Sequence, residues 1–334
     1  MLTTIIVNSA AEIEPKQTTL NLIRVAAERG YTVWVAGVGD LSCPADGQVM
    51  AYVRQLTQTH YDSYHTLLDE IRTVEPLFRP LSESDVVLMR TNPARDKRRA
   101  PLHTAALALM RMVRDAGTVV LNDPDGLIRA SSKLYLQELP AGVKPLTLVS
   151  SSQAEIIAFI EKLDGRAVLK PLQGTRGGDV FMVESAKDKN LLQIIDVILR
   201  QGLAMVQSFI PEAVNGDTRV LVMNGEILEI DGRPAAFRRI PIGSDFRSNV
   251  DVGGKTAQAV ITPTMREVVA QVGPFLRRDG LFMVGLDFIG NMICEVNTYS
   301  PGGLRAAKKY EDVDFTTPVW DAVIAYYNSE RSQT

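Results

Sequence analysis

Residues 285–303 read GLDFIGNMICEVNTYSPGG and are the clearest indication of how the chain folds. Two short apolar runs, LDFI and ICEVN, flank a polar turn, and this pattern predicts an antiparallel hairpin. With a three-residue loop at 290–292, Asp287 lies opposite Glu295, and Asn297 shares their face because side chains alternate along a strand. A two-residue loop would place the two carboxylates on opposite faces, so the prediction depends on the length of the loop.

The three polar side chains of this hairpin suggest a metal site. Carboxylate and amide oxygens are hard ligands of the kind that Mg²⁺ takes when it bridges nucleotide phosphates. The alternative is a sheet whose polar residues face water, and the neighbouring apolar residues support it equally: Leu286, Phe288, Ile293 and Val296. An Asp, a Glu and an Asn that share one face among such neighbours favour the metal.

A second stretch, RAVLKPLQGTRGGDVFMVE at 166–184, predicts two strands around a glycine-rich turn. Gly174, Gly177 and Gly178 can adopt positive φ without steric cost, so the N–H groups of the turn can point inward and cradle an anion such as a triphosphate. Lys170 lies four residues before Gly174 and would add a positive charge. The alternative is an ordinary hairpin turn with a solvated lysine nearby.

The arrangement of predicted elements divides the chain into three units. Residues 1–122 alternate β-branched strands, at Leu2–Val7, 31–36, 85–90 and 118–121, with helices at 20–29 and 101–116, which indicates an open parallel α/β domain. Residues 123–205 form a small unit that carries the glycine turn, with helices at 154–163 and 190–201. Residues 206–330 are dominated by strands, interrupted by a helix at 263–278 and closed by one at 318–327, which predicts an antiparallel α+β unit.

Composition bounds the classes of function. The chain has 334 residues, 46% of them apolar, and a formal net charge of −3, so it offers no electrostatic reason to expect nucleic acid or a membrane as a partner. Its two cysteines, Cys43 and Cys294, are too few for a disulfide framework. No stretch approaches 18 apolar residues, and the N-terminus has no leader-like pattern, so a cytoplasmic protein is expected.

The three histidines, His60, His65 and His103, all lie in the first third, and each is expected in a surface or half-buried role. Chemistry then depends on lysines, arginines, carboxylates, amides and the backbone. Arginine is suited to bidentate capture of carboxylates and phosphates, although any single arginine is more often a solvated surface charge. Candidates lie between the glycine turn and the hairpin, and just beyond the hairpin: Arg219, Arg238, Arg239, Arg247 and Arg305.

In these residues the chain resembles the ATP-grasp ligases and, within them, the prokaryotic-type glutathione synthetases. The similarity runs over nearly the whole length, through LNLIRVAAERGY, VVLMRTNP, SSKLYL, VLKPLQGTRGG, VQSFIP, NGDTRVLVMNGE, RRIP, GLDFIG and EVNTYSP. It implies an ATP-grasp fold of mixed α/β and α+β class: an N-terminal open parallel α/β substrate-binding domain (1–122), a lid subdomain (123–205) and a C-terminal antiparallel α+β subdomain for metal and substrate (206–330).

The resemblance also implies roles for individual residues. Lys133 and Lys170 would contact the phosphates of ATP beneath the 174–178 loop, and Asp217 would lie near the ribose. The adenine hinge would consist of Gln207, Ser208, Phe209 and Ile210. Mg²⁺, with Mn²⁺ as the alternative, would be held by Asp287, Glu295 and Asn297. Arg219 and Arg239 would face the transferring phosphoryl group and the reacting carboxylate, and the substrate side would be lined by Arg90, Arg247, Asn249, Gly253, Gly254, Ser300 and Arg305.

The implied reaction activates the C-terminal carboxylate of a peptide acid as an acyl phosphate, which an amine attacks to form an amide, ADP and phosphate. In the family the acid is γ-glutamylcysteine and the amine is glycine, and the resemblance suggests a homo-oligomer.

One departure leaves both substrates open. The chain reads YSPGGLRAA at 299–307, with Gly302 and Gly303 where the familiar synthetases carry bulkier residues and Ala306 where they carry an acid. A related ligase with a different acyl donor or amine is one alternative. A catalytically silent nucleotide-binding protein is another, although such a protein has no reason to retain every phosphate-binding and metal-binding group.

Overall fold

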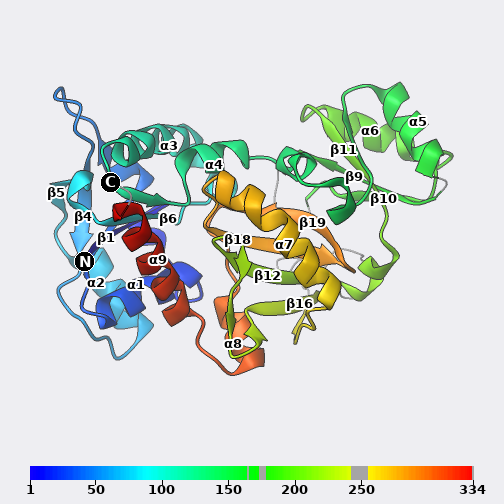
Figure 1. Cartoon of the computed structure of the whole chain (residues 1–334). Helices are drawn as coiled ribbons and strands as arrows, with labels where there is room; N and C mark the ends of the chain where they lie inside the picture. Colours follow the sequence, from blue (N-terminus) through cyan, green and yellow to red (C-terminus); the bar gives the residue numbers. More distant parts are fainter. Residues whose placement is uncertain (164, 173–177, 242–254, 333–334) are drawn as a thin grey trace.

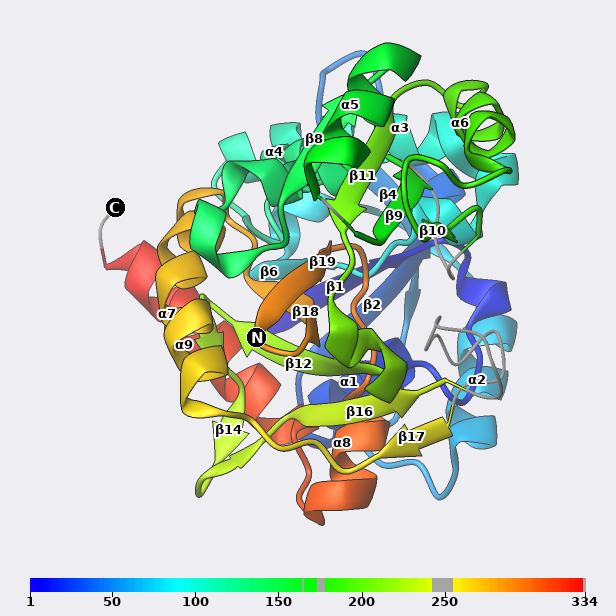
Figure 2. The same cartoon turned by 90° about the vertical axis from the view of Figure 1, so that its right-hand side faces the viewer.

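The computed structural model describes residues 1–163, 165–172, 178–241 and 255–332. Three main sheets follow one another along the molecule, each with helices packed against it (Figure 1). The sheet of the N-terminal part lies at one end, the small sheet of the middle part at the other, and the C-terminal sheet between them. Turning the molecule shows the small sheet above the strands of the C-terminal sheet (Figure 2).

The N-terminal sheet has the parallel core that the sequence predicts. Its parallel strands run in the order β2-β1-β6-β7, with bounds within two residues of the predicted ones: β1 (Leu2–Val7), β2 (Thr32–Gly37), β6 (Val86–Met89) and β7 (Val119–Leu121). Helices α1 (Thr18–Glu28) and α3 (Ala100–Asp115) are also confirmed. An antiparallel extension beyond β2, with one helix, is not in the prediction: β3 (Leu41–Ser42), β4 (Met50–Gln55), α2 (Tyr64–Thr73) and β5 (Leu77–Pro80).

The middle part is a small antiparallel sheet with a core of its own. Its strand order is β10-β9-β11-β8: β8 (Thr147–Ser150), β9 (Ala167–Pro171), β10 (Phe181–Val183) and β11 (Ala204–Ser208). Helices α5 (Gln153–Leu163) and α6 (Leu191–Leu199) pack against it. The connection from the N-terminal part, expected to be largely helical over 123–139, consists of helix α4 (Pro124–Arg129) and a 3₁₀ segment, η6 (Lys133–Glu138).

The C-terminal sheet is antiparallel, as predicted, in the order β17-β16-β12-β18-β19. Its strands are β12 (Asp217–Met223), β13 (Glu226–Ile227) beside β12, β16 (Ala236–Ile240), β17 (Lys255–Ala257), β18 (Met283–Ile289) and β19 (Met292–Asn297). A separate strand pair, β14 (Glu229–Ile230) with β15 (Arg233–Pro234), follows β13. Helix α7 (Pro263–Arg278) matches its predicted bounds and packs on this part, whereas α8 (Leu304–Glu311) is an additional helix.

The loop between β18 and β19 differs from the prediction. Ile289 pairs with Met292, so the loop has two residues, not three, and the expected loop length is wrong. The register then shifts between Asp287 and Phe288, because Cys294 forms a β-bulge in β19. The extra residue restores the pairing, so that Asp287 still lies opposite Glu295.

The last helix, α9 (Thr316–Arg331), returns to the N-terminal part and packs against α1 (Figure 1). Trp320 is fully buried there, and its indole Nε1 donates a hydrogen bond to the carbonyl of Leu22 at 2.9 Å. His103 also differs from expectation, since it is only 4% exposed and its Nε2 lies 3.0 Å from Asp96 Oδ2. The carboxylate of Asp96, which lies just before α3 and is itself buried, makes that position available to a histidine.

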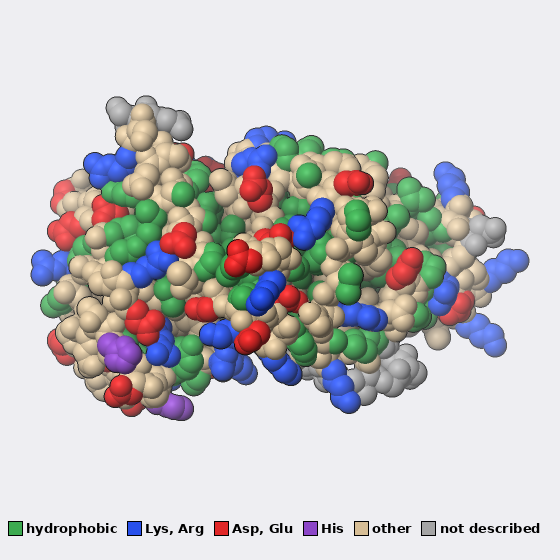
Figure 3. Space-filling view, turned by 60° about the horizontal axis from the view of Figure 1, so that its bottom comes forward, with side chains coloured by type: hydrophobic (Ala, Val, Ile, Leu, Met, Phe, Trp, Pro, Cys, Tyr) green, Lys and Arg blue, Asp and Glu red, His purple; other side chains and the backbone are tan. Residues whose placement is uncertain are grey.

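Within the described ranges, no helix combines the length and the apolar character that crossing a membrane requires. On the face seen in Figure 3, basic and acidic side chains are interspersed. That face therefore carries no large patch of a single sign.

Candidate functional site

Asp287, Glu295 and Asn297 come together on one face of the β18–β19 hairpin, as the sequence predicts. Asp287 pairs with Glu295, and Asn297 pairs with Gly285, two residues before Asp287. The Nδ2 of Asn297 donates to Asp287 Oδ2 at 3.1 Å. Asp287 is only 2% exposed, so its carboxylate depends on neighbouring groups rather than on water.

Two arginines from the adjoining strands supply those groups. Arg219 on β12 lies opposite Asp287, and its guanidinium forms a two-pronged ion pair with that carboxylate, with Nη2 2.8 Å from Oδ2. Arg239 on β16 reaches the same carboxylate, with Nη2 2.7 Å from Asp287 Oδ2. Both arginines are themselves buried, so the three side chains form one charged cluster across three neighbouring strands.

Asp217, expected near a ribose, contacts this cluster from the other side. It lies opposite Arg239 in the register of β12 and β16, and its two carboxylate oxygens accept from Arg239 Nε at 2.6 Å and Nη2 at 2.7 Å. Arg239 is therefore shared between two aspartates, and its planar guanidinium is fixed in orientation.

The two facing carboxylates of the hairpin differ in pKa. Burial alone would raise the pKa of Asp287, but Arg219 and Arg239 lower it below its ordinary value on balance. Burial raises the pKa of Glu295, and the negative charge of Asp287 raises it further, while Lys133, Lys170 and Arg219 oppose the change. A divalent cation would relieve the repulsion that Glu295 experiences.

The lysines that the sequence analysis assigns to phosphates approach from the small sheet. Lys170 on β9 is 8% exposed, and its Nζ lies 3.4 Å from the carbonyl of Cys294, the bulged residue. Lys133, the first residue of η6, is joined to the end of β9 through its backbone N–H and the carbonyl of Leu172 at 3.0 Å. Burial lowers the pKa of both lysines, and Glu295 opposes this lowering in each case. Both ammonium groups thus lie in the field of the hairpin carboxylates.

The donor set fits a hard divalent cation. Glu295 and Asp287 provide carboxylate oxygens and Asn297 an amide oxygen, all from one face of the hairpin. Across the described ranges, no three side chains of the His, Cys, Asp and Glu types are placed so that they could hold a metal ion together, so the amide of Asn297 would be needed as the third ligand. An oxygen-ligated ion such as Mg²⁺ or Mn²⁺ matches what the hairpin offers.

The proposed hinge lies at the end of β11 and just after it. Gln207 is buried, and its Nε2 donates to Thr147 Oγ1 at 3.0 Å. The N–H groups of Ser208 and Phe209 donate to the carbonyls of Leu146 and Arg166 at 2.9 and 3.0 Å, and Ile210 follows before a 3₁₀ turn. The guanidinium of Arg166 lies 4.1 Å from the centre of the Phe209 ring. The segment from 207 to 210 is thus held in place at three successive residues.

Three of the residues assigned to the substrate side lie within the described ranges: Arg90, Ser300 and Arg305. Ser300 has a φ of +48°, Arg305 donates through Nη1 to the carbonyl of Pro15 at 3.0 Å, and Arg90 is buried beneath the 298–303 segment. Gly178 is exposed at the turn before β10. The remaining predicted residues lie outside the described ranges: Gly174, Gly177, Arg247, Asn249, Gly253 and Gly254.

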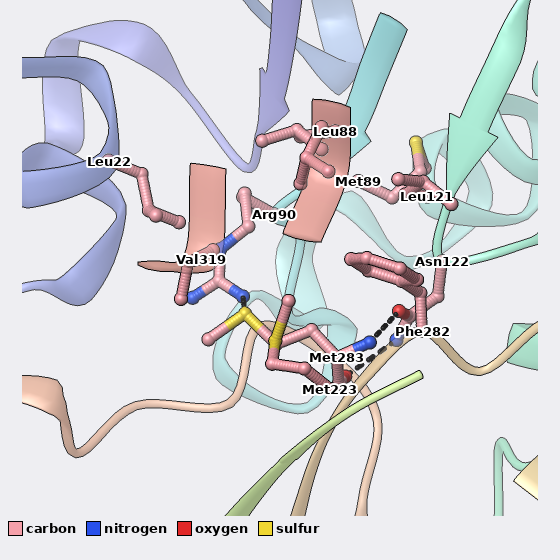
Figure 4. Close-up of a pocket in the computed structure, with 11 residues that line it drawn as sticks. Leu22, Leu88, Met89, Arg90, Leu121, Asn122, Met223, Phe282, Met283 and Val319 are labelled. Carbon is pink, nitrogen blue, oxygen red and sulfur yellow. Dashed lines mark hydrogen bonds between the residues drawn. The ribbon is translucent and has the colours of Figure 1, made fainter. Parts of the chain in front are cut away.

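Sequence reasoning missed Asn122, which follows β7. Its side chain is 4% exposed and hydrogen-bonds to the backbone of Met283 (Figure 4). It also donates to the carbonyl of Thr298, so it reaches both strands of the hairpin. The one feature of the sequence that could have indicated Asn122 is that a polar residue directly follows the apolar strand predicted at 118–121. Nothing in the local pattern indicates that its partners lie 161 and 176 residues further along the chain.

The chain is similar to one family of known proteins over nearly its whole length. The family model for the N-terminal domain of prokaryotic glutathione synthetase matches residues 1–128, and the model for the ATP-grasp domain of that family matches residues 132–312. The glutathione synthetase of Synechococcus elongatus is 34% identical over 97% of this chain and 98% of its own length.

Solved structures show the same fold. The structure of the D-cycloserine synthetase DcsG has a TM-score of 0.64 at 18% identity, covering 97% of this chain and 99% of the other. The structure of the ATP-grasp ligase PsnB in complex with a precursor variant, Mg and ADP has a TM-score of 0.61 at 18% identity. The match covers 97% of this chain and 98% of the PsnB chain. At these identities the likeness concerns the fold, and it confirms the predicted fold class.

Proposed function

The chain belongs to the prokaryotic glutathione synthetase family and is an ATP-dependent peptide ligase that makes glutathione, and we propose that the charged cluster around Asp287 is its active site. One observation carries this proposal. Side chains from β9, β12, β16, β18 and β19, together with Lys133 from η6, bring two carboxylates and four cations together where the small sheet meets the C-terminal sheet.

The cations account for the phosphate chemistry. Lys133 and Lys170 would neutralise the phosphates of ATP, and their partial desolvation strengthens that attraction. Arg219 and Arg239 would face the phosphoryl group in transfer and the carboxylate that receives it. Phosphoryl transfer depends mainly on positioning and charge stabilisation, which fixed guanidinium and ammonium groups supply without a histidine or a nucleophilic cysteine.

The residue roles follow the two half-reactions. The carboxylate of γ-glutamylcysteine attacks the terminal phosphorus of ATP and gives an acyl phosphate and ADP. The amine of glycine then adds to the acyl carbon, loses a proton, and expels phosphate as the amide forms. The hinge at Gln207–Ile210 would hold adenine, and Ser300 and Arg305, with Arg247, Asn249, Gly253 and Gly254, would lie on the substrate side. Arg90 would act on that side from beneath the 298–303 segment.

Asp287, Glu295 and Asn297 would hold Mg²⁺, with Mn²⁺ as the alternative. The ion supplies charge neutralisation for the nucleotide phosphates when bound. Asp217 would lie near the ribose, and its two hydrogen bonds to Arg239 would also keep that guanidinium oriented.

We also propose the coarser features that the resemblance implies. The division into units at 1–122, 123–205 and 206–330, a cytoplasmic location, a homo-oligomeric state, and the absence of nucleic acid and membrane partners are all part of the proposal. Light scattering after gel filtration measures the oligomeric state, and a monomer at micromolar concentration would contradict that part.

The central test is turnover. Purified protein with ATP, Mg²⁺, γ-glutamylcysteine and glycine is expected to release ADP and form glutathione, detected by mass, and omission of either substrate should stop both. Glu295→Gln and Lys170→Met should each reduce kcat by about 10²–10³-fold, because each removes a charge from the transition state. The matched controls Glu161→Gln and Lys162→Met alter exposed residues of α5 and should keep wild-type turnover.

The outcomes separate the alternatives. If another acid and amine give ADP while this pair does not, the substrates are wrong and the ligase assignment stands. If no pair turns over and ATP still binds, the protein is a silent nucleotide binder. If the control variants lose as much activity as Glu295→Gln and Lys170→Met, the cluster is not the active site.

A further inference from the structure

We propose that Asn122 and Arg90, both from the N-terminal part, are positioning residues. They hold the 298–303 segment against the β18–β19 hairpin, which carries the candidate metal ligands. The proposal rests on the proposed function, because it assigns the segment a place beside the substrates. Neither residue contacts the charged cluster among the described residues, so each would act through the backbone that it holds.

Asn122 joins the two strands of the hairpin at their open end. Its Oδ1 accepts from the N–H of Met283 at 2.7 Å, and its Nδ2 donates to the carbonyl of Met283 at 2.9 Å (Figure 4). The same Nδ2 donates to the carbonyl of Thr298 at 3.0 Å. Met283 begins β18, and Thr298 directly follows Asn297. One amide, using three of its four hydrogen-bonding positions, therefore fixes the backbone next to a candidate metal ligand.

Arg90 holds the same segment three residues further on. Its Nη2 donates to the carbonyl of Pro301 at 2.9 Å, its Nε to Thr19 Oγ1 at 3.3 Å, and its Nη1 points to the sulfur of Met283 at 3.4 Å. The side chain is 7% exposed, and all three acceptors are uncharged. Among the described residues no carboxylate pairs with it, and burial lowers its pKa to about 10, so it stays cationic at neutral pH.

A buried cation without a carboxylate partner is costly to keep, and a leucine or methionine would fill the same space without that cost. The surroundings are otherwise apolar. Arg90 and Asn122 line a cavity of about 20 Å³ whose other lining residues are all apolar, among them Leu88, Phe282 and Met283 (Figure 4). Such a cavity has room for about one water.

The segment needs such support because its backbone is not intrinsically stable. Ser300 has a φ of +48° and Gly303 a φ of +131°, and a serine in the left-handed region persists only where its surroundings hold it. Asn122 acts before this turn and Arg90 acts within it. Through these contacts, the N-terminal part fixes the backbone next to Asn297 and the backbone of the substrate side.

Asn122→Asp is the sharpest test, because it nearly preserves shape while removing both donated hydrogen bonds. We expect the KM for γ-glutamylcysteine or glycine to rise at least fivefold, while the Kd for ADP without metal stays within twofold. Arg90→Lys, which keeps the charge but cannot reach all three acceptors, should change the same KM in the same direction. If Asn122→Asp does not fold, Arg90→Lys alone carries the kinetic test.

Trp320→Phe is the matched control. It removes a buried hydrogen bond between α9 and α1 that involves no residue of the segment, and it should lower thermal stability while leaving both KM values unchanged. Equal changes in KM for the control, a parallel loss of ADP affinity, or no change in KM with Arg90→Lys would each overturn the proposal.

Hydrogen exchange tests the contact without any turnover. In ligand-free protein, the backbone amides of a peptide covering 298–303 should exchange at least tenfold faster in Asn122→Asp or Arg90→Lys than in wild type. In Trp320→Phe their exchange rate should equal that of wild type. This result would support the positioning role even if the substrates were assigned wrongly. Unchanged exchange in both Asn122→Asp and Arg90→Lys would overturn it even if glutathione were made.

Discussion

Asp287 and Glu295 show how two carboxylates on one hairpin acquire different properties. Asp287 is satisfied by Arg219, Arg239 and Asn297, and its pKa falls despite burial, because the two guanidinium groups outweigh it. Glu295 faces the same aspartate, and its pKa rises through burial and that negative charge. The difference lies in which arginines reach each oxygen and not in the residue type.

Gly303 and Gly302 allow a prediction at the scale of one residue. Gly303 has a φ of +131°, and a Cβ there would lie 2.5 Å from Phe237 Cε1, whereas a Cβ on Gly302 meets only Thr18 Oγ1 at 3.8 Å. We expect Gly303→Ala to lower the free energy of unfolding by about 1–3 kcal/mol, through backbone strain and the clash. Gly302→Ala should stay within about 0.5 kcal/mol of wild type.

Urea denaturation of the two alanine variants measures both values. Equal losses would mean that the 298–303 segment adjusts freely at both positions, which would contradict the close contact with Phe237.

At the scale of elements, the bulge at Cys294 determines the site. A two-residue loop alone would pair Glu295 with Leu286 and turn it to the other face. The extra residue in β19 corrects the register, and its carbonyl also meets Lys170, which joins the small sheet to the hairpin. Bulges of this kind are common next to active sites, where they re-aim a side chain.

The end of α7 supports a prediction on pH. Asp279 accepts two hydrogen bonds from Arg278, both at 2.8 Å, and one from the hydroxyl of Tyr135 in η6, also at 2.8 Å. Burial alone would raise the pKa of Asp279, but Arg278 and Tyr135 lower it on balance below the ordinary value of 3.8. The ionised carboxylate therefore adds stability above about pH 4, which is lost as pH falls through the lower folded pKa.

We expect Asp279→Asn to lower the free energy of unfolding at pH 7, and the difference from wild type to shrink as the pH falls below about 4. Urea denaturation at a series of pH values checks this. Tyr135→Phe should cost about 1 kcal/mol at pH 7, the usual contribution of one hydrogen bond. A difference for Asp279→Asn that grows toward acid would refute the assigned direction of the pKa.

At the scale of the whole molecule, the C-terminal helix closes the N-terminal part. Trp320 of α9 is fully buried against α1, while the neighbouring Asp321 pairs with Arg29 at 2.6 Å from a largely exposed position. Trp320→Ala should lower the free energy of unfolding by about 3–5 kcal/mol, because it removes a large buried side chain. Asp321→Ala should cost about 0–1 kcal/mol, as exposed ion pairs do.

Urea denaturation of these two variants compares burial with surface charge at one helix. A loss for Trp320→Ala no larger than that for Asp321→Ala would show that α9 is not part of the cooperative core. A large effect would show that the last residues of the chain stabilise its first domain.

The sequence predicted the strongly patterned elements well. The strand Leu2–Val7 and the helix Pro263–Arg278 have the expected bounds, because each has a clear periodicity and clear end signals. It missed the antiparallel extension at 41–80, whose short strands have half-exposed patterns. It also missed the burial of His103, which depends on Asp96 lying beside it.

The sequence by itself determined the fold class and the family, because periodicity indicates the elements and the quoted segments resemble those of the family. It also predicted that Asp287, Glu295 and Asn297 share one face of a hairpin, because side chains alternate along a strand. The tertiary structure alone decided which arginine meets which aspartate, that a bulge and not the loop sets the hairpin register, and that Asn122 and Arg90 reach across to Thr298 and Pro301. The physical reason is separation along the chain: these contacts join segments that are far apart in sequence, and only packing brings them within hydrogen-bond distance.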